Sequence, residues 1–271
     1  MELSVFYQHI VEAAKQRNMD VEEVLYAVRE MGISAVELDY EDIGDASDMR
    51  FMLDDAGLEV SSVYCFFDFG HFYDRGKAES FINAADMLGA QKVLCIAGFL
   101  GEKDDTHQCI DRMVSNLRIL CDYAEQRGIT VTVEDFDDIT SPFSNYKKLL
   151  YFLKRIPNLG ITFDTGNFLY SDIDELEAFD KLADRIVHVH CKDRSFTPKP
   201  GEVPKATISG RNMYSSPVGS GVIKMAKIID RLEDIYYDDY LVIEHFGSKD
   251  QLADIEKSAA WLNSALFSMY Y

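Results

Sequence analysis

In its second half the chain reads Ile186-Val187-His188-Val189-His190-Cys191-Lys192-Asp193-Arg194, an apolar β-branched run that ends in polar side chains. A short continuous apolar run is typical of a strand that is buried on both faces, as in a parallel sheet. Side chains two residues apart on a strand share a face, so His188 and His190 lie on one side. If this strand lines a barrel, we expect both imidazoles to point inward, with His190 nearer the carboxyl end.

Three other strand-like runs end in an acidic residue, namely Val131-Thr132-Val133-Glu134, residues 159–164 ending at Asp164, and Leu241-Val242-Ile243-Glu244. In a parallel barrel the carboxyl ends of successive strands lie side by side. We therefore expect Glu134, Asp164, His190 and Glu244 to converge on one divalent metal ion. Three carboxylates and one imidazole suit Mn²⁺, Mg²⁺, Co²⁺ or Zn²⁺. Any one of these residues alone would fit a capping or ion-paired group equally well, and it is their succession that favours a metal.

Strand-like and helix-like segments alternate along the whole chain. Expected strands cover residues 2–7, 33–38, 58–66, 92–96, 129–134, 159–164, 186–190 and 240–244. Expected helices cover residues 21–31, 46–56, 78–88, 110–124, 146–156, 173–183, 222–235 and 250–267, the first of them with a capping box formed by Asp20 and Glu23. Eight strand–helix units predict an α/β fold, a (β/α)8 barrel, as a single domain over residues 1–271. An open doubly wound sheet is the alternative, but its Gly-x-Gly-x-x-Gly motif does not follow the first strand.

The composition narrows the possible partners. The 27 Lys and Arg against 47 Asp and Glu give a formal charge of −20, which repels nucleic acid phosphates and anionic membrane surfaces. We find no run of 18 apolar residues and no secretion signal, so we expect a cytoplasmic protein that uses a small-molecule substrate, with a homo-oligomer left open. The five scattered cysteines predict buried free thiols rather than a disulfide framework.

A long segment, residues 195–220, separates the strand ending at His190 from the next helix and holds four of the six prolines. Long loops in compact domains are usually functional or disordered, so this one predicts a lid over the strand ends, or an ordered surface excursion. Ser220-Gly221 before a helix would cradle a phosphate, or belong to a solvated loop. Lysines and an arginine that could assist a phosphate site are Lys199, Lys205 and Arg211.

Several motifs together resemble one known family. They are Val131–Glu134, Phe163-Asp164-Thr165-Gly166-Asn167, residues 187–193, Pro217–Gly221 and Val242-Ile243-Glu244-His245. Over essentially the whole chain the sequence resembles the xylose isomerase-like TIM barrels, specifically the sugar phosphate isomerase/epimerase group. The resemblance implies a divalent metal held by Glu134, Asp164, His190 and Glu244. It also implies that Glu134 and Glu244 act as the acid/base pair, which moves a proton next to a carbonyl through a metal-stabilised enediolate.

One position departs from the pattern of the ketose 3-epimerases in this group. These enzymes carry a substrate-contacting histidine three residues after the aspartate ligand, whereas this chain has Asn167 there. Asparagine forms hydrogen bonds but does not titrate near neutral pH. The departure favours the broader group over the free-ketose 3-epimerases, with Asn167 as an expected substrate contact.

Other expected substrate contacts each have a structural alternative. Lys192 and Arg194 would bind a carboxylate or phosphate of the substrate, or form ion pairs at the barrel rim. Glu37 would reach a sugar hydroxyl or form a structural hydrogen bond. His71, in the aromatic loop of residues 67–72, would wall an apolar side of the pocket or pack over the barrel mouth. For His188 we expect an inner hydrogen bond rather than a metal bond.

Four functions are therefore open. The first is a metal-dependent isomerase or epimerase of a sugar, sugar acid or sugar phosphate. The second is a lyase on the same scaffold, such as a dehydratase of a keto-inositol or dehydroshikimate-like substrate, which differs in expelling a β-hydroxyl after the same proton abstraction. A metal-cluster apurinic endonuclease needs more histidines than these six and a less acidic chain. A non-catalytic sugar-binding barrel would have no need of the full ligand set.

Overall fold

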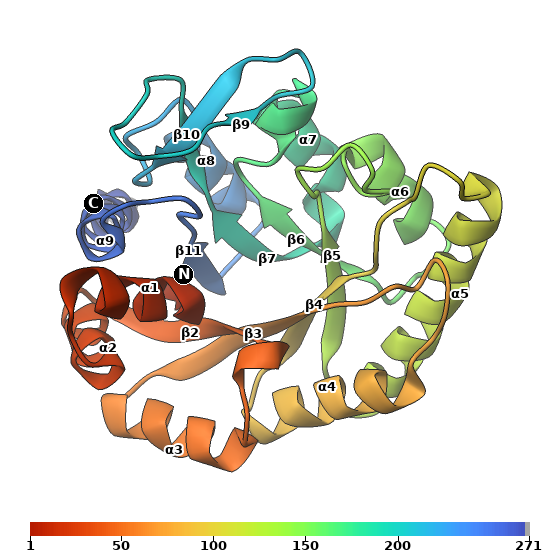
Figure 1. Cartoon of the computed structure of the whole chain (residues 1–271), viewed down its shortest axis with the longest axis horizontal. Helices are drawn as coiled ribbons and strands as arrows, with labels where there is room; N and C mark the ends of the chain where they lie inside the picture. Colours follow the sequence, from red (N-terminus) through yellow and green to blue (C-terminus); the bar gives the residue numbers. More distant parts are fainter. Residues whose placement is uncertain (269–271) are drawn as a thin grey trace.

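The computed structural model describes residues 1–268, in which eight parallel strands close into a barrel surrounded by helices (Figure 1). The strand order around the barrel is β1-β11-β7-β6-β5-β4-β3-β2, so consecutive barrel strands are neighbours and the predicted (β/α)8 fold is confirmed. The bounds are β1 (Glu2–Phe6), β2 (Ile33–Asp39), β3 (Glu59–Phe66), β4 (Lys92–Ile96), β5 (Thr130–Glu134), β6 (Gly160–Asp164), β7 (Ile186–Cys191) and β11 (Tyr240–Ile243).

The helices follow the predicted order with one addition. They are α1 (Tyr7–Arg17), α2 (Val21–Glu30), α3 (Ala46–Ala56), α4 (Arg75–Met87), α5 (Thr106–Glu125), α6 (Tyr146–Leu153), α7 (Glu175–Leu182), α8 (Met225–Asp234) and α9 (Gln251–Ser268). Sequence reasoning missed α1, which follows β1 without a break and whose preceding residue, Phe6, offers no side-chain cap. A helix that starts without a capping residue or a turn carries no start signal, and here the burial of Ile10 and Ala13 reveals its apolar face.

Helix termini elsewhere follow the local chemistry of the sequence. The capping box predicted at α2 is present, with the Asp20 amide donating to Glu23 Oε2 at 2.9 Å. The predicted stop after α3 is Gly57, whose φ of 69° lies in the left-handed region that glycine adopts without strain.

Buried polar side chains pair across the inside of the barrel. Ser4 and Ser61 lie 2.7 Å apart through their hydroxyl oxygens, and Thr132 and Thr162 are equally close. His188 on β7 reaches Glu37 on β2, three strands away in the barrel order, so this contact crosses the interior. The main apolar core instead lies between the strands and the surrounding helices. Polar side chains therefore line the barrel interior below its mouth as well as at the mouth itself.

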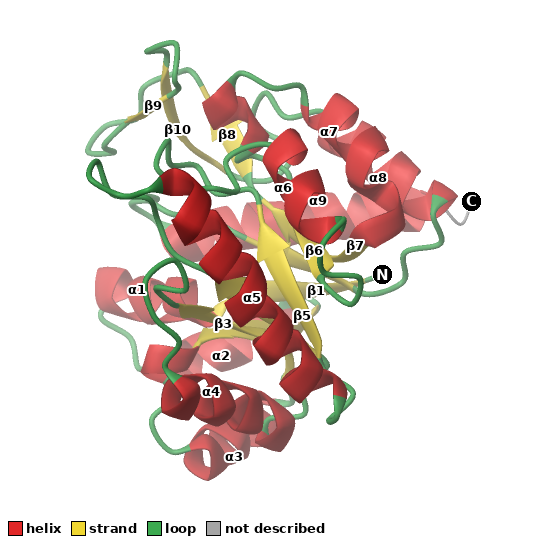
Figure 2. Ribbon diagram, turned by 90° about the vertical axis from the view of Figure 1, so that its right-hand side faces the viewer, coloured by secondary structure: helices red, strands yellow, loops and turns green. Residues whose placement is uncertain are grey.

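The segment after β7 forms a small antiparallel sheet above the strand ends (Figure 2). Its strands are β8 (Asp193–Ser195), β9 (Lys205–Ala206) and β10 (Asn212–Ser216), with β10 in the middle. The expected lid is thus an ordered excursion that leans over the barrel mouth. All five cysteines lie within the described residues, and all are free and buried, as predicted. Among residues 1–268 no helix has the length and apolarity needed to cross a bilayer.

Candidate metal centre and active site

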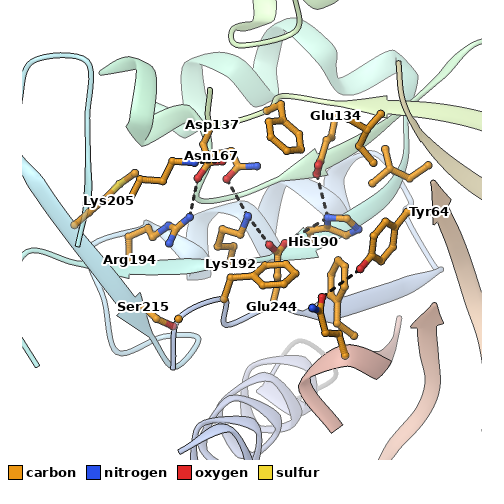
Figure 3. A pocket seen from close by; sticks show the side chains of 18 of the residues that line it. Tyr64, Glu134, Asp137, Asn167, His190, Lys192, Arg194, Lys205, Ser215 and Glu244 are labelled. Carbon is orange, nitrogen blue, oxygen red and sulfur yellow. Dashed lines mark hydrogen bonds and ion pairs between the residues drawn. The ribbon is translucent and has the colours of Figure 1, made fainter. Parts of the chain in front are cut away.

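The four residues expected to bind a metal come together at the carboxyl ends of β5, β6, β7 and β11. Figure 3 shows three of them, Glu134, His190 and Glu244. Asp164 pairs in register with His190, and Val242, two residues before Glu244, pairs with His190 from the other side. His190 Nδ1 lies 3.3 Å from Glu134 Oε2 and 3.5 Å from Glu244 Oε2. One ligand atom each from Glu134, Asp164 and His190 lies within 4.8 Å of the others.

The donor atoms of this cluster fit a divalent cation. Asp164 Oδ2, His190 Nδ1 and Glu244 Oε2 are buried and form no counted hydrogen bond among the described residues. Their close neighbours are charged groups instead, Lys192 Nζ at 2.8 Å from Asp164 Oδ2 and Glu244 Oε2 at 3.5 Å from His190 Nδ1. Buried polar atoms without a well-formed hydrogen bond are rare because part of their desolvation penalty is left uncompensated. Oxygen and imidazole donors are the set that Mn²⁺, Mg²⁺, Co²⁺ and Zn²⁺ accept. A cation between these atoms would remove the penalty at all three.

A local turn orients the side chain of Asp164. Asp164 Oδ1 accepts hydrogen bonds from the amides of Gly166 and Asn167, at 2.7 and 2.9 Å, which leaves Oδ2 directed into the cluster. A Cβ on Gly166 would lie 2.6 Å from the Lys192 carbonyl oxygen, so only glycine fits there.

Glu37 lies behind His190 and holds its ring. Its Oε2 is 3.1 Å from His190 Nε2 and 2.8 Å from His188 Nε2. A carboxylate on the far nitrogen fixes the tautomer and turns the near nitrogen, Nδ1, toward the cluster. Of the two roles expected for Glu37, the structural hydrogen bond is the one present, because its side chain is fully buried and does not line the cavity. His188 makes the inner hydrogen bond expected of it.

The pKa values of the buried glutamates depend on how well neighbouring cations compensate their charge. Burial alone would raise the pKa of Glu37, but His190 and His188 reverse this and hold it well below its ordinary value. Burial raises the pKa of Glu134 although His190 lies beside it, and burial raises the pKa of Glu244 to about 8 despite Lys192. The raised values mean that the charged forms of the two glutamates are under-compensated by the residues around them.

Lys192 forms the ion pairs that were one of its two expected roles, but it forms them with the expected metal ligands instead of at the barrel rim. Its Nζ lies 2.8 Å from Asp164 Oδ2 and 2.5 Å from Glu244 Oε1, between two of the four expected metal ligands. Burial would lower the pKa of this ammonium, but Asp164 and Glu244 raise it well above its usual range. The Lys192 ammonium supplies positive charge beside the Asp164 and Glu244 carboxylates. Its flexible side chain would allow it to move away when a metal ion binds there. Lys192 is therefore bound to the ligand carboxylates, as well as facing the cavity where a substrate would lie.

Asn167 and Arg194 also face the cavity, each with a partner. Asn167 Nδ2 donates to the Asp135 carbonyl oxygen at 2.8 Å, and its Oδ1 accepts from Lys192 Nζ at 2.9 Å. Arg194 donates to Asp137 Oδ2 at 3.1 Å, and Lys205 from the lid sheet reaches Asp137 Oδ1 at 2.6 Å. Two cations thus pair with one carboxylate at the rim, and Lys205 also helps a hydrogen bond from Thr140 to lower the pKa of Asp138.

The cavity above the cluster has a volume of about 560 Å³. An aromatic wall faces the polar floor, built from Phe6, Tyr64, Phe66, Phe136 and Phe246. The lid contributes Val203, Lys205, Met213, Tyr214 and Ser215 to the lining. Sequence reasoning missed this wall, because its members come from the ends of four separate segments. The alternation of Tyr64 and Phe66 at the end of β3 was the only local signal.

At two places the structure decides between the alternatives left open by the sequence. His71 was expected to wall the pocket or to pack over the barrel mouth, and it does not line the cavity: its ring pairs with Asp68 and Asp104, while Phe67 and Phe69 of the same loop pack into the core. Ser220-Gly221 does not offer a free phosphate cradle. The amides of Gly219 and Gly221 donate to the Asp193 carboxylate, at 3.0 and 2.8 Å, so this chain supplies its own anion.

Comparison with known proteins agrees with this architecture. The family model described as xylose isomerase-like TIM barrel matches residues 25–265. A 3-dehydroshikimate dehydratase of Bacillus anthracis is 25% identical over 205 residues, covering 72% of this chain and 71% of the relative. An uncharacterized protein of Methanocaldococcus jannaschii is 25% identical over 182 residues, which cover 65% of this chain but only 57% of that relative's length.

Solved structures share the fold at lower identity. An L-ribulose 3-epimerase superposes with a TM-score of 0.76 at 19% identity, covering 98% of this chain and 95% of the other. The IOLI protein with a bound zinc atom gives a TM-score of 0.77 at 16% identity, covering 100% of this chain and 99% of the other. At this level of identity the likeness extends to the barrel and its closure.

Proposed function

This chain belongs to the xylose isomerase-like TIM barrel family, and we propose that it is a divalent-metal-dependent isomerase or epimerase of a sugar, sugar acid or sugar phosphate. The observation that carries the proposal is the position of Glu134 and Glu244. Both carboxylates approach the same imidazole nitrogen, at 3.3 and 3.5 Å, on the floor of a cavity that is large enough for a small carbohydrate.

The two glutamates have the chemistry that stereochemical inversion next to a carbonyl needs. One carboxylate removes the proton from the carbon, and the other returns a proton to the opposite face, so no atom is gained or lost. Both carboxylates are held in fixed positions, because Glu134 is the last residue of β5 and Glu244 directly follows β11. Positioned acid/base groups of this kind contribute about 10²–10⁴-fold to rate.

A divalent cation held by Glu134, Asp164, His190 and Glu244 would supply Lewis-acid polarisation of the substrate's carbonyl and hydroxyl oxygens. The residues around it would complete the substrate site. Asn167 and Lys192 present an amide and an ammonium to substrate oxygens, and the aromatic wall excludes water from the apolar side of a sugar ring.

The charge at the rim favours a substrate that carries an anionic group. Arg194 and Lys205 both pair with the Asp137 carboxylate, so two cationic side chains lie together at the rim of the cavity. A substrate carboxylate or phosphate could bind beside them, with the planar guanidinium able to bind it through two hydrogen bonds. Sugar acids and sugar phosphates are therefore preferred over neutral ketoses.

A dehydratase remains the second candidate, on two observations. The relative named as a 3-dehydroshikimate dehydratase is aligned over 72% of this chain, and Asn167 replaces the histidine expected of a free-ketose 3-epimerase. In that reaction the same proton abstraction is followed by loss of a β-hydroxyl as water. The cavity residues would serve either outcome, because both begin with a carbanion next to a carbonyl.

Hydrogen–deuterium exchange distinguishes these reactions. The chain is incubated in D2O with Mn²⁺, Mg²⁺, Co²⁺ or Zn²⁺ and a panel of ketoses, keto acids, keto-inositols and sugar phosphates, and products are followed by NMR. We expect metal-dependent wash-in of one deuteron next to the carbonyl, with inversion or carbonyl migration. Loss of water to give an enone would favour the dehydratase. Absence of exchange across the panel with every metal would contradict both reactions.

A further inference from the structure

A second cluster of metal-binding side chains lies outside the barrel mouth. It joins the loop after β3, which carries Asp68 and His71, to the loop after β4 and the first turn of α5, which carry Asp104 and Cys109. His71 Nδ1 lies 2.6 Å from Asp68 Oδ1, and His71 Nε2 lies 3.1 Å from Asp104 Oδ1 and 4.0 Å from Cys109 Sγ. None of these residues lines the cavity.

We propose that His71, Asp104 and Cys109 form a separate metal site that takes Zn²⁺, or Co²⁺ in its place. One ligand atom from each residue lies within 4.8 Å of the other two. Around a tetrahedral ion with bonds of about 2.0–2.3 Å, neighbouring ligand atoms lie about 3.3–3.8 Å apart. The observed distances of 3.1 and 4.0 Å from His71 Nε2 straddle that range, so shifts of a few tenths of an ångström admit the ion.

The ligand atoms are oriented by the groups behind them. Asp68 binds the far nitrogen of His71, which turns Nε2 toward Asp104 and Cys109, the arrangement seen behind most metal-binding histidines. Asp104 Oδ2 accepts a hydrogen bond from the Gly101 amide at 2.6 Å, which leaves Oδ1 directed at the histidine. Cys109 is almost fully buried, and its sulfur makes a long hydrogen-bonding contact to His71 Nε2 at 4.0 Å.

The ligand types decide which metal this site prefers. A thiolate with an imidazole and a carboxylate selects Zn²⁺ or Co²⁺ over Mg²⁺ and Mn²⁺. The barrel cluster, in contrast, has oxygen and nitrogen donors among its expected ligands. His71 keeps about 40% of its side chain exposed, so a water would have access to the fourth coordination position.

A thiol nucleophile activated by His71 is the competing interpretation of a Cys–His–Asp trio. In such a trio the histidine base must bind the sulfur. Here His71 Nε2 is nearer to Asp104 than to Cys109, and the sulfur is buried rather than presented to a substrate. The geometry therefore favours three ligands around a cation over a base beside a nucleophile.

The site would hold two loops together beside the cavity. Phe66 and Ile96 are the last residues of β3 and β4 and line the cavity, and the two loops that the metal would bridge begin directly after them. The loops are already joined by the Phe69 amide, which donates to the Ala97 carbonyl oxygen at 2.9 Å. A metal between His71 and Cys109 would add a second connection at their outer ends.

Cobalt spectroscopy of the full chain tests this inference. The chelator-treated, reduced protein is titrated with Co²⁺ while its near-ultraviolet absorption is followed, because a thiolate-to-cobalt charge-transfer band requires sulfur ligation. We expect the amplitude of the band to correspond to one sulfur-bound Co²⁺ per chain, while a second Co²⁺ binds the barrel cluster without adding to it, and we expect the band to disappear in Cys109→Ser. The barrel cluster stays silent in this band because Cys191, beside His190, packs into the apolar core.

Two further variants keep the test decisive if Cys109→Ser folds poorly. His71→Ala, on an exposed loop, should weaken Co²⁺ binding at this band by at least tenfold. His107→Ala, on the exposed side of the same first turn of α5, should leave it unchanged. Zn²⁺ should bleach the band and protect Cys109 from iodoacetamide.

A saturating Co²⁺ titration without a charge-transfer band would overturn the inference. A band that persists in both Cys109→Ser and His71→Ala would do the same. Rapid alkylation of Cys109 that Zn²⁺ does not slow would support the nucleophile instead. These outcomes are independent of any sugar turnover at the barrel mouth.

Discussion

Two histidines in this molecule are held in the same way in very different surroundings. His190 lies between Glu37 and Glu134, at 3.1 and 3.3 Å, and His71 lies between Asp68 and Asp104, at 2.6 and 3.1 Å. His190 is 1% exposed and stands on a strand, whereas His71 is 40% exposed and stands on a loop. The contacts are alike, so the difference between the two sites comes from burial and support.

Burial changes what each carboxylate–imidazole contact is worth. Around His190 water cannot screen the charges, so removal of one partner leaves another charge buried and uncompensated. Around His71 the same removal is repaired by solvent. Rigid strands also fix the buried group, while loops let the exposed one adjust. The comparison therefore predicts a catalytic, high-energy centre at His190 and an adaptable binding site at His71.

The largest effect is expected from substitution of the two glutamates that form the acid/base pair of the buried site. Glu134→Gln and Glu244→Gln should each lower turnover by about 10²–10⁴-fold, because each removes a proton carrier and a metal-ligand charge. The measurement is the rate of deuterium wash-in on the substrate found in the panel. Glu256→Gln, an exposed glutamate on α9, is the matched control and should retain full rate. Full activity in either site variant would remove that glutamate from the mechanism.

The next prediction compares the two histidines directly through their outer carboxylates. In the metal-free protein, Glu37→Gln should lower the free energy of unfolding by about 3–5 kcal/mol, because it leaves the buried His190 and His188 without their shared anion. Asp68→Asn should lower it by less than about 1 kcal/mol, since that pair is exposed. Urea unfolding measures both. Equal losses would mean that burial does not separate the sites.

Metal removal should have an intermediate effect. A ligand present at 100 times its dissociation constant stabilises a protein by about 2.7 kcal/mol, so chelation of Mn²⁺ should lower Tm by about 5–10 °C. Mn²⁺ is chosen because the sulfur-containing cluster disfavours it. Lys192→Met should enlarge this shift, because Asp164 and Glu244 then lose the ammonium that partly replaces the cation.

The control for that experiment is Lys154→Met, at an exposed position after α6. Its Tm shift on chelation should match that of the wild type. An unchanged Tm after verified removal of the metal would contradict a tightly bound ion in the barrel, and a smaller shift in Lys192→Met would contradict the exchange between ammonium and cation.

The smallest effect concerns pH at the exposed histidine. In the chelated protein, hydrogen bonds to Asp68 and Asp104 raise the pKa of His71 above its ordinary value of 6.5. A raised pKa in the folded state means that this pairing stabilises the protein fully below the unfolded value and loses its effect as pH rises through the folded one. NMR titration should show the raised midpoint in the wild type and a lower one in Asp68→Asn. An identical midpoint in both would show that Asp68 does not act on this ring.

Local pattern in the sequence was enough to predict the barrel and to predict that Glu134, Asp164, His190 and Glu244 lie close together, whereas their binding of a metal stays a prediction. A β-rich run followed by an acidic or imidazole side chain recurs four times, and alternating strands and helices place those ends beside one another. Helix α1 could not be predicted in the same way, because it starts directly after β1 without a capping residue.

The sequence by itself therefore determined the fold and the candidate ligand set, since both follow from periodicity and strand direction. Only the tertiary structure decided the partners of those residues. Glu37 contacts His188, which is 151 residues away in the chain, and Lys192 after β7 contacts Asp164 at the end of the neighbouring strand β6. His71 was equally plausible as a cavity wall until its loop was seen to turn toward Asp104. Such choices depend on which distant groups share a low-dielectric space, and no local pattern encodes that.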